Sequence, residues 1–96
     1  MHSIIQTVTY DKWFRSLRDA QARARILKRL KQVELGSLGD YKPVGEGVSE
    51  LRIDYGQGYR IYFIQRGYEV IILLAGGDKS TQDKNIKAAI QLAREL

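Results

Sequence analysis

The chain has 96 residues, enough for one small domain with a single core and too few for two. Hydrophobic residues make up 44% and charged residues 28% of it, which is typical of a globular protein and excludes a disordered chain. The absence of cysteine excludes disulfides and thiolate metal sites. The longest apolar run, 70–75, is too short for a membrane span, and the N-terminus lacks a signal-peptide pattern, so we expect a soluble cytoplasmic protein.

The charge balance is basic, with a net charge of +5 and a pI near 9.6. Such a balance indicates polyanionic partners, either nucleic acid or an acidic protein. A surface that merely keeps the protein in solution explains the same charge, so charge alone does not decide between these interpretations.

The first half of the sequence predicts a short strand followed by two helices. β-Branched residues over 3–9 favour the strand. Apolar residues then recur at helical spacing over 13–17 and 26–33, and Asp19 is placed to cap the second helix. Glycines end that helix, and "GDYKPVGEG" at 39–47 predicts a loop.

The second predicted helix carries a basic outer face. A solvated charged surface is the simpler interpretation, and contact with a phosphate backbone in RNA or the ribosome is the functional one. The candidate residues are Arg23, Arg25, Lys28, Arg29 and Lys31.

The second half predicts three strands, at 48–55, 59–66 and 69–75, and a closing amphipathic helix. The segment "GGDK" at 76–79 is expected to break the sheet, and "STQD" at 80–83 has the form of a helix capping box. The predicted order is therefore β-α-α-β-β-β-α. This order indicates an α+β fold, a twisted and mostly antiparallel sheet with a helical hairpin packed on one face.

The segment "ELRIDYGQGYRIYF" at 50–63 predicts a hairpin with the three-residue loop 56–58. Side chains alternate across a sheet, so one face is apolar and suits the helices, while the other is polar and is expected to be open to solvent. The expected polar face carries Glu50, Arg52, Asp54, Arg60 and Tyr62.

Two interpretations of this polar face stay open. Asp54 opposite Arg60 and Arg52 opposite Tyr62 can be ordinary cross-strand pairs, each worth about 0.2–1 kcal/mol. Alternatively, the arginines are there to hold a phosphate, since the planar guanidinium binds phosphate through several donors.

Three segments resemble a known family: "ELR" at 50–52, "GYRIY" at 58–62 and "GGDKSTQ" at 76–82. They resemble the toxins of the RelE/ParE superfamily, in particular the HigB-like branch often labelled addiction-module killer proteins. The resemblance covers nearly the whole chain. It implies a RelE-like fold and a toxin of a type II toxin–antitoxin system that enters the ribosomal A site and cuts mRNA. It also implies a HigA-like helix-turn-helix antitoxin, through which alone the toxin would reach operator DNA.

The resemblance also implies roles for single residues. Arg60 matches the strand arginine that grips the scissile phosphate, Arg52 lies where related toxins carry a basic residue or a histidine, and Lys79 falls near a basic residue at the end of the last strand. Metal-independent cleavage by a 2′-hydroxyl needs a base, positive charge at the phosphorane and an acid, and no cofactor.

The acid and the base are harder to place. Tyr62 or Lys79 can donate a proton if the nearby arginines lower its pKa. Glu50, Asp54 or Asp78 can accept one. Asp78 and Lys79 can equally serve only to shape the turn and the start of the last helix. The only histidine, His2, lies at the terminus, and the tail lacks the tyrosine or histidine that some relatives carry.

Two other functions remain open at this point. ParE-like relatives inhibit DNA gyrase by binding it, and an inactive remnant would only bind the antitoxin as a co-repressor. The nuclease interpretation requires Arg52, Arg60 and Lys79 to converge on one phosphate. On this interpretation Arg60→Ala abolishes toxicity and leaves the fold intact, whereas Phe63→Ala acts through stability.

Overall fold

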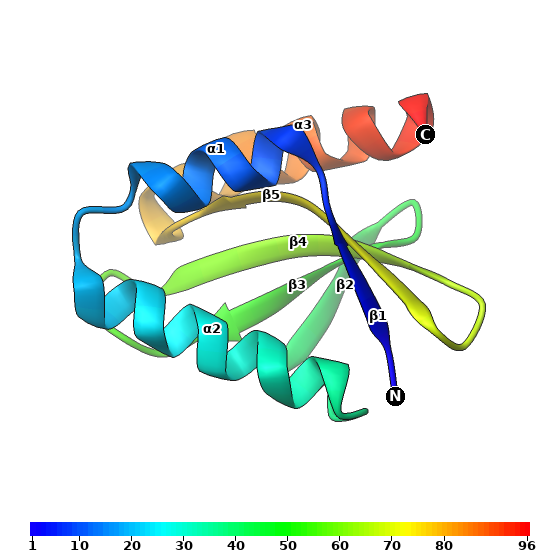
Figure 1. Ribbon diagram of the computed structural model, residues 1–96. Helices are drawn as coiled ribbons and strands as arrows, with labels where there is room; N and C mark the ends of the chain where they lie inside the picture. Colours follow the sequence, from blue (N-terminus) through cyan, green and yellow to red (C-terminus); the bar gives the residue numbers. More distant parts are fainter.

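One five-stranded sheet organises the protein, and the computed structural model describes all of residues 1–96 (Figure 1). The strands are β1 (Ser3–Gln6), β2 (Tyr41–Gly45), β3 (Val48–Ile53), β4 (Tyr59–Arg66) and β5 (Val70–Gly77). The helices are α1 (Val8–Ser16), α2 (Ala20–Glu34), the 3₁₀ turn η1 (Lys79–Thr81) and α3 (Gln82–Glu95). The strands lie in the order β1-β5-β4-β3-β2, with β1 parallel to β5 and every other pair antiparallel. The predicted α+β fold is confirmed.

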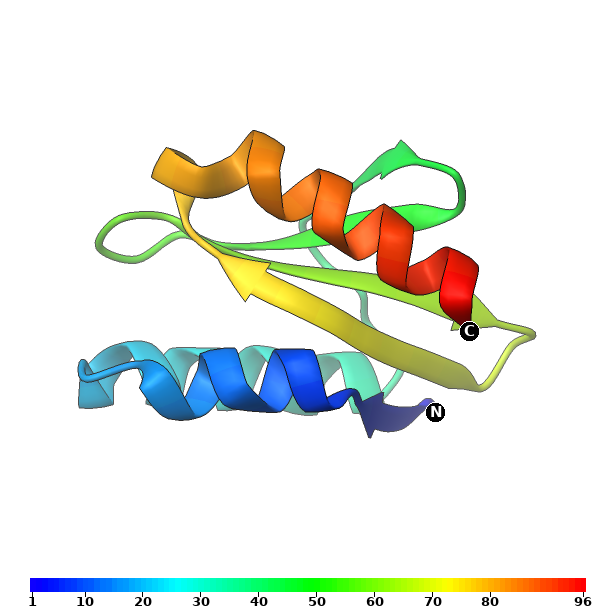
Figure 2. The ribbon, with the colours of Figure 1, turned by 90° about the horizontal axis from the view of Figure 1, so that it is seen from above.

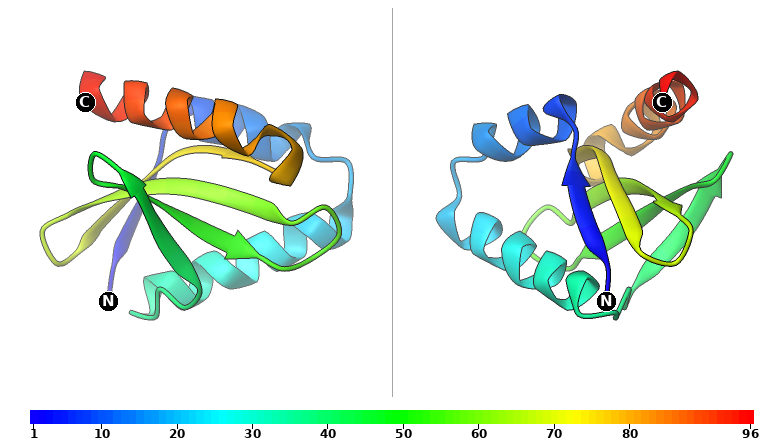
Figure 3. Two further views of the ribbon diagram at one scale, coloured as in Figure 1. Left: turned by 180° about the vertical axis from the view of Figure 1, so that it is seen from behind. Right: turned by 45° about the vertical axis from the view of Figure 1, so that its right-hand side comes forward.

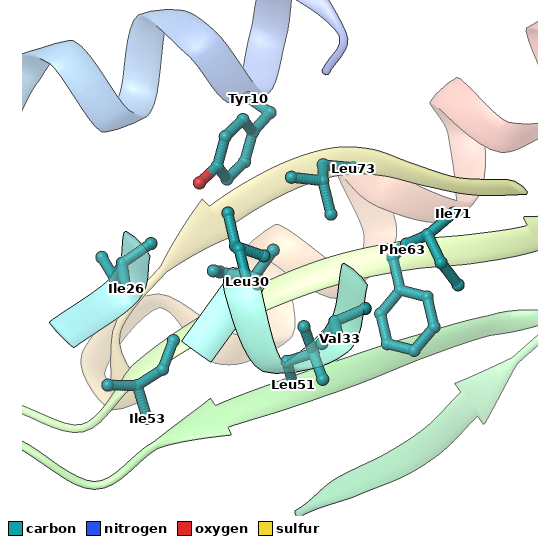
Figure 4. Close-up of a cluster of buried hydrophobic side chains, with 10 residues drawn as sticks. Tyr10, Ile26, Leu30, Val33, Leu51, Ile53, Phe63, Ile71 and Leu73 are labelled. Carbon is teal, nitrogen blue, oxygen red and sulfur yellow. The ribbon is translucent and has the colours of Figure 1, made fainter. Parts of the chain in front are cut away.

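Helices cover both faces of the sheet (Figure 2). The helical hairpin α1–α2 lies on one face, as predicted, and α3 lies on the other. Ten buried side chains between the hairpin and the sheet form the first core cluster, in which Phe63 and Leu51 face Val33 of α2 (Figure 4). A second cluster of five buried residues, including Tyr62 of β4 and Ala89 of α3, lies under α3.

The start of each hairpin helix follows from a capping side chain. Asp19 accepts hydrogen bonds from the backbone N–H groups of Gln21 and Ala22, at 2.9 and 3.2 Å, and so caps α2 as predicted. Thr7 caps α1 by accepting from the N–H of Tyr10 at 3.2 Å. This cap stops the first strand at Gln6, so the predicted strand over 3–9 is too long.

Two strand boundaries differ from the prediction. The predicted loop at 39–47 contains β2, an edge strand that pairs with β3 although it holds Pro43. An edge position tolerates proline because the missing N–H leaves no bond broken inside the sheet. The predicted break at 76–79 does fall within that segment, but two residues later than its start, because β5 continues through Gly77.

The β3–β4 hairpin has a loop of five residues, 54–58, and not the predicted three. Arg52 therefore pairs with Arg60 and Glu50 with Tyr62, so the predicted pairs Asp54–Arg60 and Arg52–Tyr62 are wrong. The register differs from the predicted one by two residues, the period of a strand, so the assignment of residues to faces survives.

The expectation that the polar face is open to solvent is wrong for most of its members. Glu50 and Tyr62 are fully buried and Arg60 is 8% exposed, since α3 packs over them. Arg52 is partly exposed and Asp54 is exposed. None of the helices combines the length and the apolar composition needed to cross a membrane.

Candidate active site

The centre of the candidate site is Glu50, a fully buried carboxylate on β3. Its Oε1 accepts a hydrogen bond from Nε of Arg52 at 3.2 Å, and its Oε2 accepts one from Nε2 of Gln82 at 3.1 Å. Nε of Arg60 lies 3.8 Å from Oε1. Because an unpaired carboxylate costs several kcal/mol to bury, these partners from β3, β4 and α3 are what allows Glu50 to be there.

Arg60 is buried beside Glu50, whereas the sequence predicted a side chain open to solvent. Its Nη1 donates to the backbone carbonyls of Gly58 and Tyr59, at 3.4 and 3.2 Å. Removing this side chain would leave the Glu50 carboxylate short of a buried counter-charge, which typically costs about 3–5 kcal/mol. The premise that Arg60 faces open solvent is wrong, and we now expect Arg60→Ala to lower stability as well as activity.

Lys79 approaches the same place from the sheet end that leads into α3. The side chain is exposed, and its aliphatic stem lies directly over Gly58, where an added Cβ would come within 2.8 Å of Cε of Lys79. Gly58 also has a φ of +77°, a backbone conformation that favours glycine. The ammonium of Lys79 takes part in no ion pair.

Arg52, Arg60 and Lys79, which we call the cationic cluster, thus gather at one end of the sheet. Glu50 joins the two arginines, and Gly58 contacts both Arg60 and Lys79. The loop of the β3–β4 hairpin and the start of α3 lie side by side at this end (Figures 1 and 3). In this cluster the guanidinium of Arg52 is partly exposed, the ammonium of Lys79 is exposed, and Arg60 is buried.

Tyr62 does not have the acidity expected of a proton donor. Burial, aided by the nearby Glu50 carboxylate, raises the pKa of the Tyr62 hydroxyl to about 12, although Arg60 acts in the opposite direction. The hydroxyl is buried and makes no hydrogen bond of standard geometry, although the Glu50 carboxylate lies close enough to contribute to the raised pKa. Arg60 does act to lower this pKa, but burial outweighs it, so the condition set for Tyr62 as a proton donor is not met.

Asp78 ends β5 and caps the turn that follows. Its carboxylate accepts hydrogen bonds from the backbone N–H of Ser80 at 2.8 Å and from the Ser80 hydroxyl at 2.5 Å. The predicted capping box at 80–83 is therefore absent, and Thr81 makes no side-chain cap to α3. This geometry agrees with the structural interpretation of Asp78.

Gln82 is a site residue that the sequence analysis did not identify. It lies 32 positions after Glu50, and only the packing of α3 across β3 and β4 brings the two side chains together. No spacing rule connects positions on a strand and a distant helix. The one indication was that Gln82 closes the third segment of the family resemblance.

Comparison with known proteins places the chain in a family. The model of the family described as Phage derived protein Gp49-like (DUF891) matches residues 12–96. The chain belongs to this family. It is also 51% identical over 90 residues to a protein of Haemophilus influenzae described as an uncharacterized protein, covering 94% of this chain and 91% of that protein. The Gp49-like family shares the RelE/ParE-like toxin fold.

In this Gp49-like chain the basic residues of α2 differ in how far they are bound to the rest of the protein. Arg23 donates to the carbonyl of Leu17, and Lys31 pairs with Glu34 at 2.9 Å. Arg29 donates to the carbonyl of Asp40 at 2.9 Å, and burial lowers its pKa. Two members of the predicted set remain free of such bonds on the exposed side of the helix, namely Arg25 and Lys28.

Proposed function

We propose that the protein is the toxin of a type II toxin–antitoxin system, a ribosome-dependent endoribonuclease that cuts mRNA. The observation that carries the proposal is the convergence of Arg52, Arg60 and Lys79 at one end of the sheet. Arg52 and Arg60 share a single buried carboxylate, Glu50, and Lys79 lies over the neighbouring Gly58 without an acidic partner, so the cluster has a net positive charge. Guanidinium and ammonium groups that are preorganised before the substrate binds can stabilise the dianionic phosphorane of RNA cleavage without a metal.

Each member of the cluster has a distinct part in this proposal. Lys79 and Arg52 contact the scissile phosphate, because they are the exposed and partly exposed members. Arg60 is a positioning residue that shares Glu50 with Arg52 and so fixes where the guanidinium of Arg52 lies. Attack by the substrate's own 2′-hydroxyl breaks the bond to the 5′-oxygen of the next nucleotide, which restricts the reaction to RNA.

The proposal includes a partner, a HigA-like helix-turn-helix antitoxin, through which the toxin would reach operator DNA. Two observations support it: the RelE/ParE-like fold and the net charge of +5, which favours an acidic partner.

The test compares the wild type with Lys79→Met in translation on purified ribosomes with a defined mRNA, mapped by primer extension. Methionine keeps an unbranched stem over Gly58 and removes only the ammonium. We expect ribosome-dependent cuts with the wild type and a loss of about a hundredfold in cleavage with the variant. The matched control is Lys87→Met, an exposed lysine of α3 outside the cluster, which should cut like the wild type.

Two results would count against the proposal. Undiminished cleavage by Lys79→Met would remove Lys79 from the reaction. A message left intact by the wild type would contradict the nuclease as a whole, and the next assay would then be gyrase supercoiling, which tests the ParE-like alternative.

A further inference from the structure

A groove between α2 and the end of β3 is rich in positive charge. Its volume is about 530 Å³, which is within the range of small-ligand sites. Four cationic and two anionic side chains leave a formal charge of +2 in its lining. The charged lining residues are Arg25, Lys28, Arg29, Arg52, Asp40 and Asp54.

The cations of the groove differ in how free they are. Arg29 is committed to the protein, since it donates to two backbone carbonyls at the end of the helix hairpin. Lys28 is exposed and takes part in no ion pair or hydrogen bond with the protein. It is therefore available to an anion from outside.

Arg25 is held in place without being neutralised. Its guanidinium carbon lies 4.7 Å from the centre of the Tyr55 ring, and the Tyr55 hydroxyl donates to Asp19 at 3.2 Å. A guanidinium resting on an aromatic ring keeps its charge and its outward N–H donors. Arg25 is exposed, so its outer plane can also stack on a nucleobase.

Arg52 connects this groove with the cationic cluster. It lines the groove at the end of β3, and its Nε binds Glu50 in the candidate active site. Arg52 is therefore the residue that the two cationic regions share, at the end of β3.

We propose that the groove binds the backbone of single-stranded RNA on its way to or from the cationic cluster, with phosphates at Arg25 and Lys28. The inference deepens the proposed nuclease function and rests on it, because it assigns a second contact to the same substrate strand. An acidic peptide is the less favoured occupant, since the groove itself carries Asp40 and Asp54 and offers a stacking plane that a peptide carboxylate does not use.

The test measures binding of fluorescent 2′-O-methyl oligouridines of two and eight nucleotides, which cannot be cleaved because the attacking hydroxyl is blocked. The groove variant is the double substitution Arg25→Gln and Lys28→Gln. We expect about tenfold weaker binding of the eight-nucleotide probe and unchanged binding of the dinucleotide. The slope of log affinity against log salt should fall by about 1.4, as loss of two phosphate contacts on a single strand requires.

The control variant removes the same charge elsewhere, by Lys87→Gln on α3 and Arg66→Gln at the end of β4. Equal losses in the groove and control variants would overturn the proposal by showing a general charge effect. Competition by polyglutamate that is as strong as by the eight-nucleotide probe would overturn it in favour of an acidic protein partner.

The outcome is independent of cleavage. If the groove variant binds RNA normally while the wild type cuts mRNA, the groove proposal is wrong and the nuclease stands. If the probe binds in the groove but no mRNA is cut on ribosomes, the groove stands as an RNA site and the nuclease is wrong.

Discussion

At the scale of single residues, Tyr62 couples the candidate site to pH. Burial favours its neutral phenol and raises the pKa to about 12 in the folded protein, against about 10 in the unfolded chain. Its contribution to stability is therefore complete below pH 10 and is lost as the pH rises from 10 to 12. The loss should reach about 2–3 kcal/mol.

Tyr62→Phe should remove this part of the pH dependence. At neutral pH the variant should be as stable as the wild type or slightly more stable, because the hydroxyl it loses makes no hydrogen bond of standard geometry. Urea unfolding from pH 8 to pH 12 measures both effects as a difference between the two proteins. Tyr68→Phe, at a side chain that is 92% exposed, should follow the wild type. Identical pH profiles for wild type and Tyr62→Phe would contradict the prediction.

The sequence identified the cations of the site better than the residues that hold them in place. Arg52, Arg60 and Lys79 lie in the segments that resemble known toxins, and the structure brings them together. The Glu50–Gln82 bond was not predictable, because it depends on how a helix crosses the sheet. Tyr62 was placed on the correct face but in the wrong surroundings, since alternation along a strand does not reveal which face a later helix covers.

At the scale of elements, the contact between α1 and β5 depends on the absence of a side chain. A Cβ at Gly76 would lie 2.1 Å from Cε3 of Trp13, a distance that forces the indole or the strand to move. Gly76 therefore allows the indole ring of Trp13, on α1, to pack against the backbone of β5.

Gly76→Ala should lower the free energy of unfolding by about 1–3 kcal/mol, the usual cost of overpacking a core. Chemical denaturation of Gly76→Ala, Trp13→Leu and the double variant measures the coupling. The double variant should lose clearly less than the two single losses combined, because the smaller leucine makes room for the methyl group. Additive losses would show that the two positions do not act through this contact.

The helices were easier to predict than the sheet. The second helix has both a capping residue, Asp19, and a regular apolar face, and these act within one element. By contrast, β2 contains Pro43 and leads directly into the short turn before β3, so its own residues favour a loop. Only pairing with β3 makes this segment a strand. The hairpin register failed for a related reason, since Gly56 and Gly58 permit loops of different length.

At the scale of the whole molecule, the sheet separates two cores of unequal size. Phe63 belongs to the larger one and is 2% exposed. Phe63→Ala should lower the free energy of unfolding by about 3–5 kcal/mol, from lost burial and the cavity that remains. Thermal or urea unfolding measures this, with Tyr68→Ala as an exposed control that should change stability by less than about 0.5 kcal/mol. A loss at Phe63 no larger than at Tyr68 would contradict the assigned core.

The overall architecture was predictable because local patterns and the family resemblance pointed to the same α+β fold. The position of α3 was not, although Ile86, Ala89 and Ile90 already marked one apolar face on it. An amphipathic helix shows that it packs against something, not on which side of a sheet it does so.

The pairing of β1 with β5 sets the order in which the fold can be completed. Ser3 lies beside Val70 and Gln6 beside Leu73, and the N–H of Thr7 donates to the carbonyl of Leu73 at 3.1 Å. On the ribosome the first strand emerges long before its neighbour exists, so it waits unpaired while most of the chain is made. A polypeptide interrupted before residue 70 lacks this edge of the sheet and also Ile71 and Leu73 of the larger core. The native sheet can therefore be completed only late in biosynthesis. Pairing of two strands that lie far apart in the sequence also slows folding.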